Sequence, residues 1–224
     1  MNALPDGVSP RVFLRPIGSP LTLGMSGLAI ASLVQSGLDL HWIAKEQTMK
    51  VGLILLAVPF VLQVIASVLA YLARDGAAGA ALGVLATSWL AVGLVHITSS
   101  PGSRSGALGL MLLASAGMLS LAALSVGVAK PLPGLVFLIE AIRFAIAGIY
   151  ELGGVTTWGN VAGIVGLVVV GGAAYSALAF ELEGQQRRPV LPTFRRGRGR
   201  AAVLGPVDAA VDDVFHDAGV RQTT

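Results

Sequence analysis

Two opposite charges interrupt one of the most apolar stretches of the sequence. Residues 137–151 read FLIEAIRFAIAGIYE, with Glu140 and Arg143 near the middle. Side chains three residues apart lie on one face of a helix, so these two can form an ion pair. One interpretation is functional: Arg143 attracts an anionic carboxylate, and Glu140 acts as a gate or a proton site. The other is a structural ion pair that only holds helices or protomers together.

The composition indicates that these charges lie within a membrane. Hydrophobic residues make up 54% of the 224 residues and charged residues only 12%, and the mean hydropathy is +0.79. A soluble domain carries roughly a quarter charged residues, so this chain has too few charges to cover a soluble core. A charge at the centre of a membrane helix costs ~2.5–3.5 kcal/mol on insertion scales. Glu140 and Arg143 should therefore face protein or a water-filled path.

Six apolar segments of roughly bilayer-crossing length follow one another along the chain. They predict an all-α integral membrane protein with six transmembrane helices, at 20–43, 51–73, 78–97, 106–128, 134–150 and 159–182. The predicted organisation is an N-terminal cytoplasmic tail at 1–19, a membrane domain at 20–182 and a basic, largely disordered cytoplasmic tail at 183–224. Within that tail, the pattern VDAAVDDVF at 207–215 predicts a short surface helix.

The distribution of positive charge predicts how the helices are oriented. Six spans place both termini on one side, and seven arginines follow the last span: Arg187, Arg188, Arg195, Arg196, Arg198, Arg200 and Arg221. The opposite side holds only Lys45, Lys50 and Arg104. Because cytoplasmic segments carry the excess of Lys and Arg, we expect both termini inside, in a multi-pass protein of the plasma membrane. The basic tail would face anionic lipid.

A few polar, aromatic and small residues within the spans are further candidates. Gln63, Trp89 and Tyr175 each suit a pathway lining or ordinary packing. Asp39 lies near the outer end of the first span, and we expect it to be solvated there. Glycines three or four apart, such as Gly163 and Gly166, allow helix backbones to approach closely in lipid. They predict tight packing within one bundle or, alternatively, contacts between protomers.

The sequence contains few residues suited to catalysis or metal binding. It has no cysteine, and its histidines (His41, His96 and His216) do not have metal-ligand spacing. No nucleophile elbow or phosphate-binding loop is present, and no nucleic-acid module accompanies the arginines. We therefore expect no enzyme activity, no metal, no other cofactor and no nucleic-acid partner.

The sixth span and the residues after it resemble the acetate uptake transporter family, the succinate–acetate permeases. The resemblance consists of AGIVGL at 162–167, Tyr175, the glutamates Glu181 and Glu183, and Val-Leu-Pro at 190–192. PLTL at 20–23 resembles the end of that family's Asn-Pro-Ala-Pro-Leu-Gly-Leu motif, and the spacing from Gln63 to Trp89 is also similar. The resemblance covers about residues 17–192. It implies a six-helix protomer, a homo-hexamer with a separate pore in each protomer, and transport of acetate, related monocarboxylates or succinate, often with protons.

The third span departs from the family's pattern. It reads LGVLATSW at 82–89, where the family has Phe-x-Ser-Tyr-Gly-x-Phe-Trp, so most of the aromatic rings that narrow the family's pore are missing. We predict a transporter or channel for a small carboxylate anion, such as acetate or succinate. Its expected pore-lining residues are Gln63, Leu82, Leu85, Ser88, Trp89, Glu140, Arg143 and Tyr175. The alternative is a non-conducting structural or regulatory membrane protein that keeps the hexameric fold, with Leu82 and Leu85 as a plug.

Overall fold

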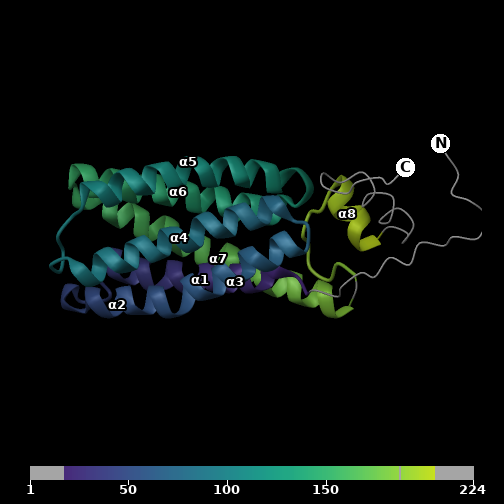
Figure 1. Cartoon of the computed structure of the whole chain (residues 1–224), viewed down its shortest axis with the longest axis horizontal. Helices are drawn as coiled ribbons and strands as arrows, with labels where there is room; N and C mark the ends of the chain where they lie inside the picture. Colours follow the sequence, from purple (N-terminus) through teal and green to yellow (C-terminus); the bar gives the residue numbers. More distant parts are fainter. Residues whose placement is uncertain (1–17, 187, 205–224) are drawn as a thin grey trace, which may run out of the picture.

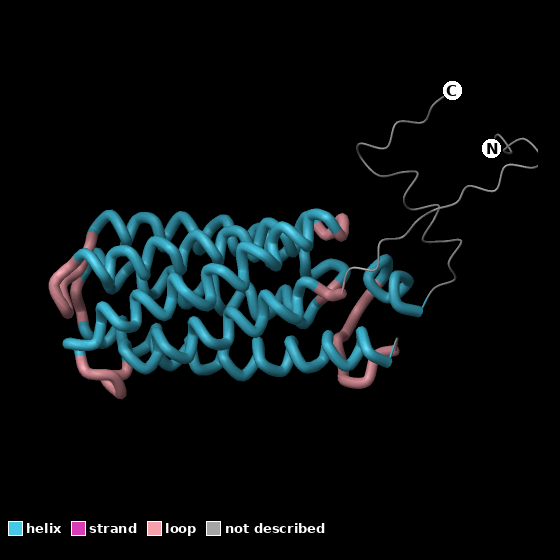
Figure 2. The backbone as a smooth tube through the Cα atoms, turned by 60° about the horizontal axis from the view of Figure 1, so that its bottom comes forward, coloured by secondary structure: helices cyan, strands magenta, loops and turns pink. Residues whose placement is uncertain are grey.

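The computed structural model describes residues 18–186 and 188–204, and its regular elements there are all helical (Figure 2). The long helices run side by side along the molecule (Figure 1). The α-helices are α1 (Pro20–Asp39), α2 (Thr48–Leu55), α3 (Val61–Leu72), α4 (Gly76–Thr98), α5 (Gly106–Ala129), α6 (Pro131–Gly153), α7 (Thr156–Gln186) and α8 (Gly197–Leu204). A 3₁₀ turn, Lys45–Gln47, precedes α2, and a π-helical turn, Leu56–Phe60, joins α2 to α3. The predicted tail helix at 207–215 and residues 1–17 lie outside the described residues.

The structure confirms the prediction of six helices long and apolar enough to span a membrane. They are Pro20–Asp39, Lys45–Leu72, Gly76–Thr98, Gly106–Ala129, Pro131–Gly153 and Thr156–Gln186. Their bounds differ from the predicted ones by a few residues. The first helix ends at Asp39 because residues 40–43 form a turn, and the last continues to Gln186, past the apolar segment.

A proline distorts the second span. Pro59 lies buried inside the π-helical turn Leu56–Phe60, and a proline in a helix removes one backbone donor and kinks the chain. The turn and the start of α3 lie against α1: a Cβ added at Gly27 would lie 3.5 Å from the Pro59 carbonyl oxygen and 3.2 Å from both Leu62 Cβ and Gln63 Cγ. The close approach lets the Gln63 amide nitrogen donate to the Gly24 carbonyl, at 3.4 Å.

The helices form a closed ring. Neighbours pack in the order α1, α3, α4, α5, α6, α7 and back to α1, with α2 continuing α3 beside α4. Large buried side chains fill the ring's interior, including Met25, Leu82, Leu85, Phe137 and Phe180. Apolar side chains also cover the outside, among them Leu53, Val68, Leu110, Leu121, Val168 and Leu178. An apolar exterior of this kind suits hydrocarbon as the surrounding solvent.

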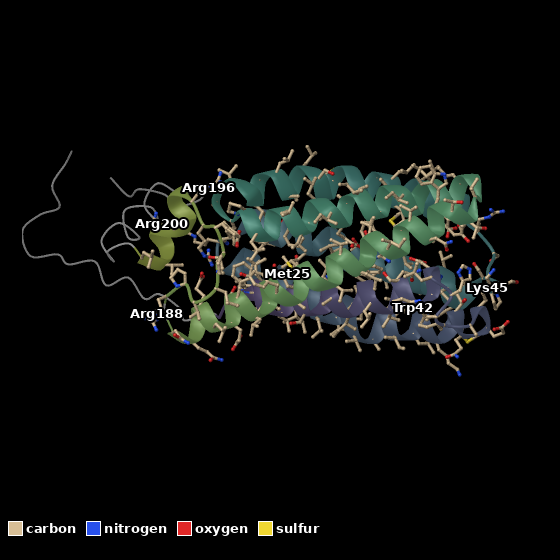
Figure 3. The ribbon with its side chains drawn as sticks, turned by 180° about the vertical axis from the view of Figure 1, so that it is seen from behind. Met25, Trp42, Lys45, Arg188, Arg196 and Arg200 are labelled. Atoms are coloured by element: carbon tan, nitrogen blue, oxygen red, sulfur yellow. The ribbon has the colours of Figure 1, made fainter. Side chains whose placement is uncertain are left out.

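The two ends of the bundle carry different groups. Figure 3 shows Arg188, Arg196 and Arg200 at one end, which we call the tail end, and Trp42 and Lys45 at the opposite or far end. At the tail end, Asp75 accepts from the backbone N–H of Ala78 at 3.3 Å, which caps α4. Asp75 also pairs with Lys130, so the α3–α4 turn is joined to the α5–α6 turn.

Residues 188–204, which we call the strap, fold back onto the tail end of the bundle. Glu183 accepts from Thr193 Oγ1 at 3.3 Å and from Arg195 Nε at 3.0 Å. The Arg195 guanidinium lies over the Phe180 ring, 5.4 Å from its centroid. The backbone N–H of Arg196 donates to the Ala129 carbonyl at 3.1 Å. The strap is therefore held to both α5 and α7.

Candidate functional site

A cavity of about 110 Å³ lies at the far end of the ring. Side chains from α1, α4, α5, α6 and α7 line it, together with the turn after α4. His41, Lys45 and Glu151 line it on the side of the turns, and Trp89 and Arg143 line it deeper in the bundle. The cavity thus connects the polar turns with the charged residues that the sequence placed within a membrane span.

Arg143 links three helices at the inner end of the cavity. Its side chain is 2% exposed. Nη1 donates to Glu140 Oε1 at 3.1 Å on the same helix, and Nη2 donates to Asp39 Oδ2 at 3.4 Å on α1. Nε donates to the carbonyl of Ala162 on α7 at 3.3 Å. The predicted contact between Glu140 and Arg143 is therefore present, with α1 and α7 as further partners.

Glu140 is the deeper of the two carboxylates that meet Arg143. It is fully buried, and its second oxygen accepts from Ser32 Oγ at 3.5 Å. It is not among the residues that line the cavity. Buried ions must be paired and hydrogen-bonded to offset their desolvation, and Glu140 has both kinds of partner.

The expectation that Asp39 is solvated near the end of its span is wrong. Its side chain is only 16% exposed, pairs with Arg143 and lines the cavity. Gln35 Nε2 donates to Asp39 Oδ1 at 2.8 Å, and Gln35 Oε1 lies 3.0 Å from His96 Nε2. The four-residue spacing of Gln35 and Asp39 was a local signal of their contact. The contact with Arg143, which is distant in sequence, had none.

Trp89 provides an unused hydrogen-bond donor beside Arg143. The ring is 1% exposed, the Arg143 guanidinium lies 5.4 Å from its centroid, and Phe144 packs edge-on with centroids 5.5 Å apart. The indole N–H has no acceptor within the described part of the chain. Most buried donors in proteins are paired, so this unpaired N–H stands out beside Arg143 in a residue that lines the cavity.

Gly166 allows α7 to lie directly against Arg143. A Cβ added at Gly166 would lie 2.7 Å from Arg143 Nε and would also collide with Ser36 Oγ. At Gly163, one turn earlier, a Cβ would lie 3.1 Å from Asp39 Cβ. Both glycines therefore pack within one bundle, the first of the two predicted roles, and both support the charged group.

The remaining predicted pore residues separate into two groups. Leu82, Leu85, Gln63 and Ser88 are buried in the ring's interior, but none lines the cavity. Because α4 runs from the tail end to the far end, Leu85 and Leu82 lie about one and two turns beyond Trp89 on the tail-end side. Gln63 Oε1 has no partner among the described residues, whereas Ser88 Oγ bonds Ser115 Oγ at 3.0 Å.

Tyr175 lies apart from the other predicted site residues. It is 36% exposed, and its hydroxyl donates to the carbonyl of Pro192 at 3.1 Å. Tyr175 therefore contacts the strap. Among the described residues, no group of three or more His, Asp or Glu is placed to hold a metal ion.

Together, fold and site define the class: a multi-pass helical membrane protein whose helix ring encloses a charged cavity. No family model and no curated protein matches the sequence. Among solved structures, the chain is similar to "Structure of the bacterial acetate channel SatP", with a TM-score of 0.69 and 20% identity. The match covers 79% of this chain and 99% of that one. At this identity the similarity establishes the fold, and it supports the resemblance to the acetate permeases as a divergent case.

Proposed function

We propose that the protein is a channel or transporter for small carboxylates such as acetate or succinate. The observation that carries this proposal is the far-end cavity, which leads to the buried Arg143 within a fold shared with an acetate channel. Arginine is well suited to binding a carboxylate through paired hydrogen bonds. The cavity volume of about 110 Å³ suits a small solute, since drug-sized ligands occupy sites of ~300–1,000 Å³.

In this proposal, the solute enters at the far end past Lys45 and His41 and reaches Arg143 and Trp89. It then crosses the interior leucines, Leu82 and Leu85, when the ring loosens, and leaves at the tail end. Both termini and the tails at 1–19 and 183–224 face the cytoplasm, because the tail end carries the exposed arginines. The membrane domain, 20–182, lies in the plasma membrane and assembles as a homo-hexamer. The carboxylates beside Arg143 support proton coupling as a feature of the same site.

The test is a flux screen in proteoliposomes that contain the purified full-length chain. Acetate, other small monocarboxylates and succinate are compared with ammonium and urea. We expect uptake of at least one carboxylate well above that of protein-free liposomes, and no comparable uptake of urea. Uptake of ammonium or urea without any carboxylate would contradict the proposal.

A second candidate is a non-conducting structural or regulatory membrane protein. The full burial of Leu82 and Leu85 favours it, because two leucines between the cavity and the tail end can act as a dry plug. The same screen separates the candidates, since a non-conducting protein passes none of the solutes. A folded, monodisperse preparation without flux would favour this second function.

A further inference from the structure

The three hydrogen bonds of Arg143 differ in how easily a ligand can replace them. The bond to the Ala162 carbonyl holds the guanidinium to the α7 backbone, and Glu140 is fully buried away from the cavity. Asp39 alone among the partners is a side chain that lines the cavity, and its 3.4 Å contact is the longest of the three. Its side chain is also the most exposed of the three, at 16% against 2% for Arg143 and 0% for Glu140.

The side chain of aspartate has the chemistry of a small carboxylate substrate. Beyond Cα it is a methylene group that bears a carboxylate, which is acetate attached to a backbone. A guanidinium recognises the planar carboxylate in both. Trp89 lines the same cavity, and its indole N–H has no acceptor among the described residues.

We propose that the Asp39 carboxylate occupies the position on Arg143 that a substrate carboxylate takes. A small carboxylate then displaces Asp39 from Arg143 when it binds. The proposal rests on the proposed function, because it assigns a step to the same site. The incoming carboxylate takes over Nη2 of Arg143 and accepts from the Trp89 N–H. Asp39 turns away and keeps its bond to Gln35.

The charges favour displacement of Asp39 by the substrate over binding of the substrate beside Asp39. Arg143 already pairs with two carboxylates, Glu140 and Asp39. A third carboxylate would place three carboxylates around one guanidinium in a poorly hydrated space, and their mutual repulsion and desolvation make this costly. Exchange keeps two carboxylates on the guanidinium. The displaced Asp39 remains in a cavity that the positively charged Lys45 also lines.

Exchange also alters how the ring is held. The Asp39 contact joins the far end of α1 to α6 through Arg143. When substrate replaces Asp39, this link is broken while the links of Arg143 to Glu140 and to α7 remain. Substrate binding therefore loosens α1 against its neighbours, which couples occupancy of the cavity to opening of the path beyond it.

An internal competitor lowers apparent affinity by the fraction of time that it leaves the site free. Asp39→Asn removes the competing charge and keeps an oxygen that accepts from Gln35. We expect this variant to bind acetate about tenfold more tightly than the unmodified chain. Glu151→Gln is the matched control, because it removes the same charge from the same cavity without touching Arg143. We expect it to change acetate affinity by no more than about twofold.

The experiment measures acetate binding to the full-length chain in lipid nanodiscs by calorimetry, at constant pH and ionic strength. Asp39→Asn, Glu151→Gln, Arg143→Lys and the Asp39→Asn/Arg143→Lys pair are compared. Lysine keeps the positive charge but lacks the paired N–H donors of the guanidinium. The gain in acetate affinity from Asp39→Asn should therefore largely disappear in the double variant. Asp39→Ser, which also offers an oxygen to Gln35, replaces Asp39→Asn if that variant does not fold.

Three results would overturn the exchange proposal. Unchanged or weaker acetate binding by Asp39→Asn would do so, as would an equal gain for Glu151→Gln, which indicates general charge repulsion. The third is a gain from Asp39→Asn that persists in full with Arg143→Lys. Failure of the proposed function gives a different result, in which the unmodified chain neither binds nor passes any carboxylate in either assay.

Discussion

Carboxylates pair with basic side chains at both ends of the bundle, but the pairs differ in depth. At the tail end, Asp75 and Lys130 join two turns with side chains 23% and 20% exposed. Inside the bundle, at the inner end of the far-end cavity, Glu140 and Arg143 are 0% and 2% exposed. A water-accessible pair costs little to form and contributes little, whereas a buried pair must offset a large desolvation cost. An ion pair therefore holds two turns together at the tail end, whereas the buried ion pair borders the candidate site.

The largest effect should come from removing the arginine at the far end. Arg143→Gln leaves Glu140 and Asp39 without their cationic partner, and breaking a buried pair costs ~3–5 kcal/mol. Lys130→Gln at the tail end should cost about 1 kcal/mol or less, because water can solvate its partner Asp75, which is 23% exposed. Denaturant unfolding in detergent micelles measures both. Equal losses would show that depth does not distinguish the two ends.

The helices, and the site contact between neighbours on one helix, were predictable from the sequence. Hydrocarbon cannot satisfy backbone N–H and C=O groups, so every span must be an apolar helix of about twenty residues. A pattern of this kind is visible along the chain. The contact between Glu140 and Arg143 was predictable on the same grounds, because a three-residue spacing on a helix places both side chains on one face.

The rest of the site depends on pairings between distant segments. Asp39 meets Arg143 across 104 positions, and Trp89 meets it from α4. No local pattern identifies such partners, and a charge at the end of a span is usually hydrated. The π-helical turn at Pro59 was missed because a proline in a helix permits several distortions. The strap was missed because Glu183 and Arg195 lie in a polar segment without apolar periodicity.

Leu82 and Leu85 lie between the far-end cavity and the tail end. Shortening one of these side chains should open a path from the cavity to the tail end. Leu85→Ala should cost about 2–4 kcal/mol, the usual range for a buried leucine, and should raise carboxylate flux severalfold if Leu85 closes the path. Leu94→Ala on the same helix is the control, because Leu94 is 47% exposed. Proteoliposome flux and unfolding are measured together. A loss of stability with no change in flux would assign Leu85 to packing alone.

A methyl group added to α7 should have opposite effects at the two ends. Gly166→Ala forces a carbon against Arg143 Nε and Ser36, and overpacking of this kind costs ~1–3 kcal/mol. Gly184→Ala near the tail end meets nothing within 4 Å and should stabilise the helix by about 0.5–1 kcal/mol. Thermal unfolding reports both, and acetate binding should weaken only for Gly166→Ala. A stabilising Gly166→Ala would mean that Arg143 can move aside freely.

The smallest effect on the bundle should come from releasing the strap. Glu183→Gln removes the charge that holds Thr193 and Arg195, so unfolding of the six spans should change by about 1 kcal/mol or less. The strap itself should become accessible, and trypsin should cleave after Arg195 and Arg196 several times faster. Glu181→Gln is the control two residues away, since its only described partner is Gln185 at 3.0 Å. If Glu183→Gln instead destabilised the bundle as much as Arg143→Gln, the tail-end pair would be as essential as the far-end one, and the contrast between the ends would fail.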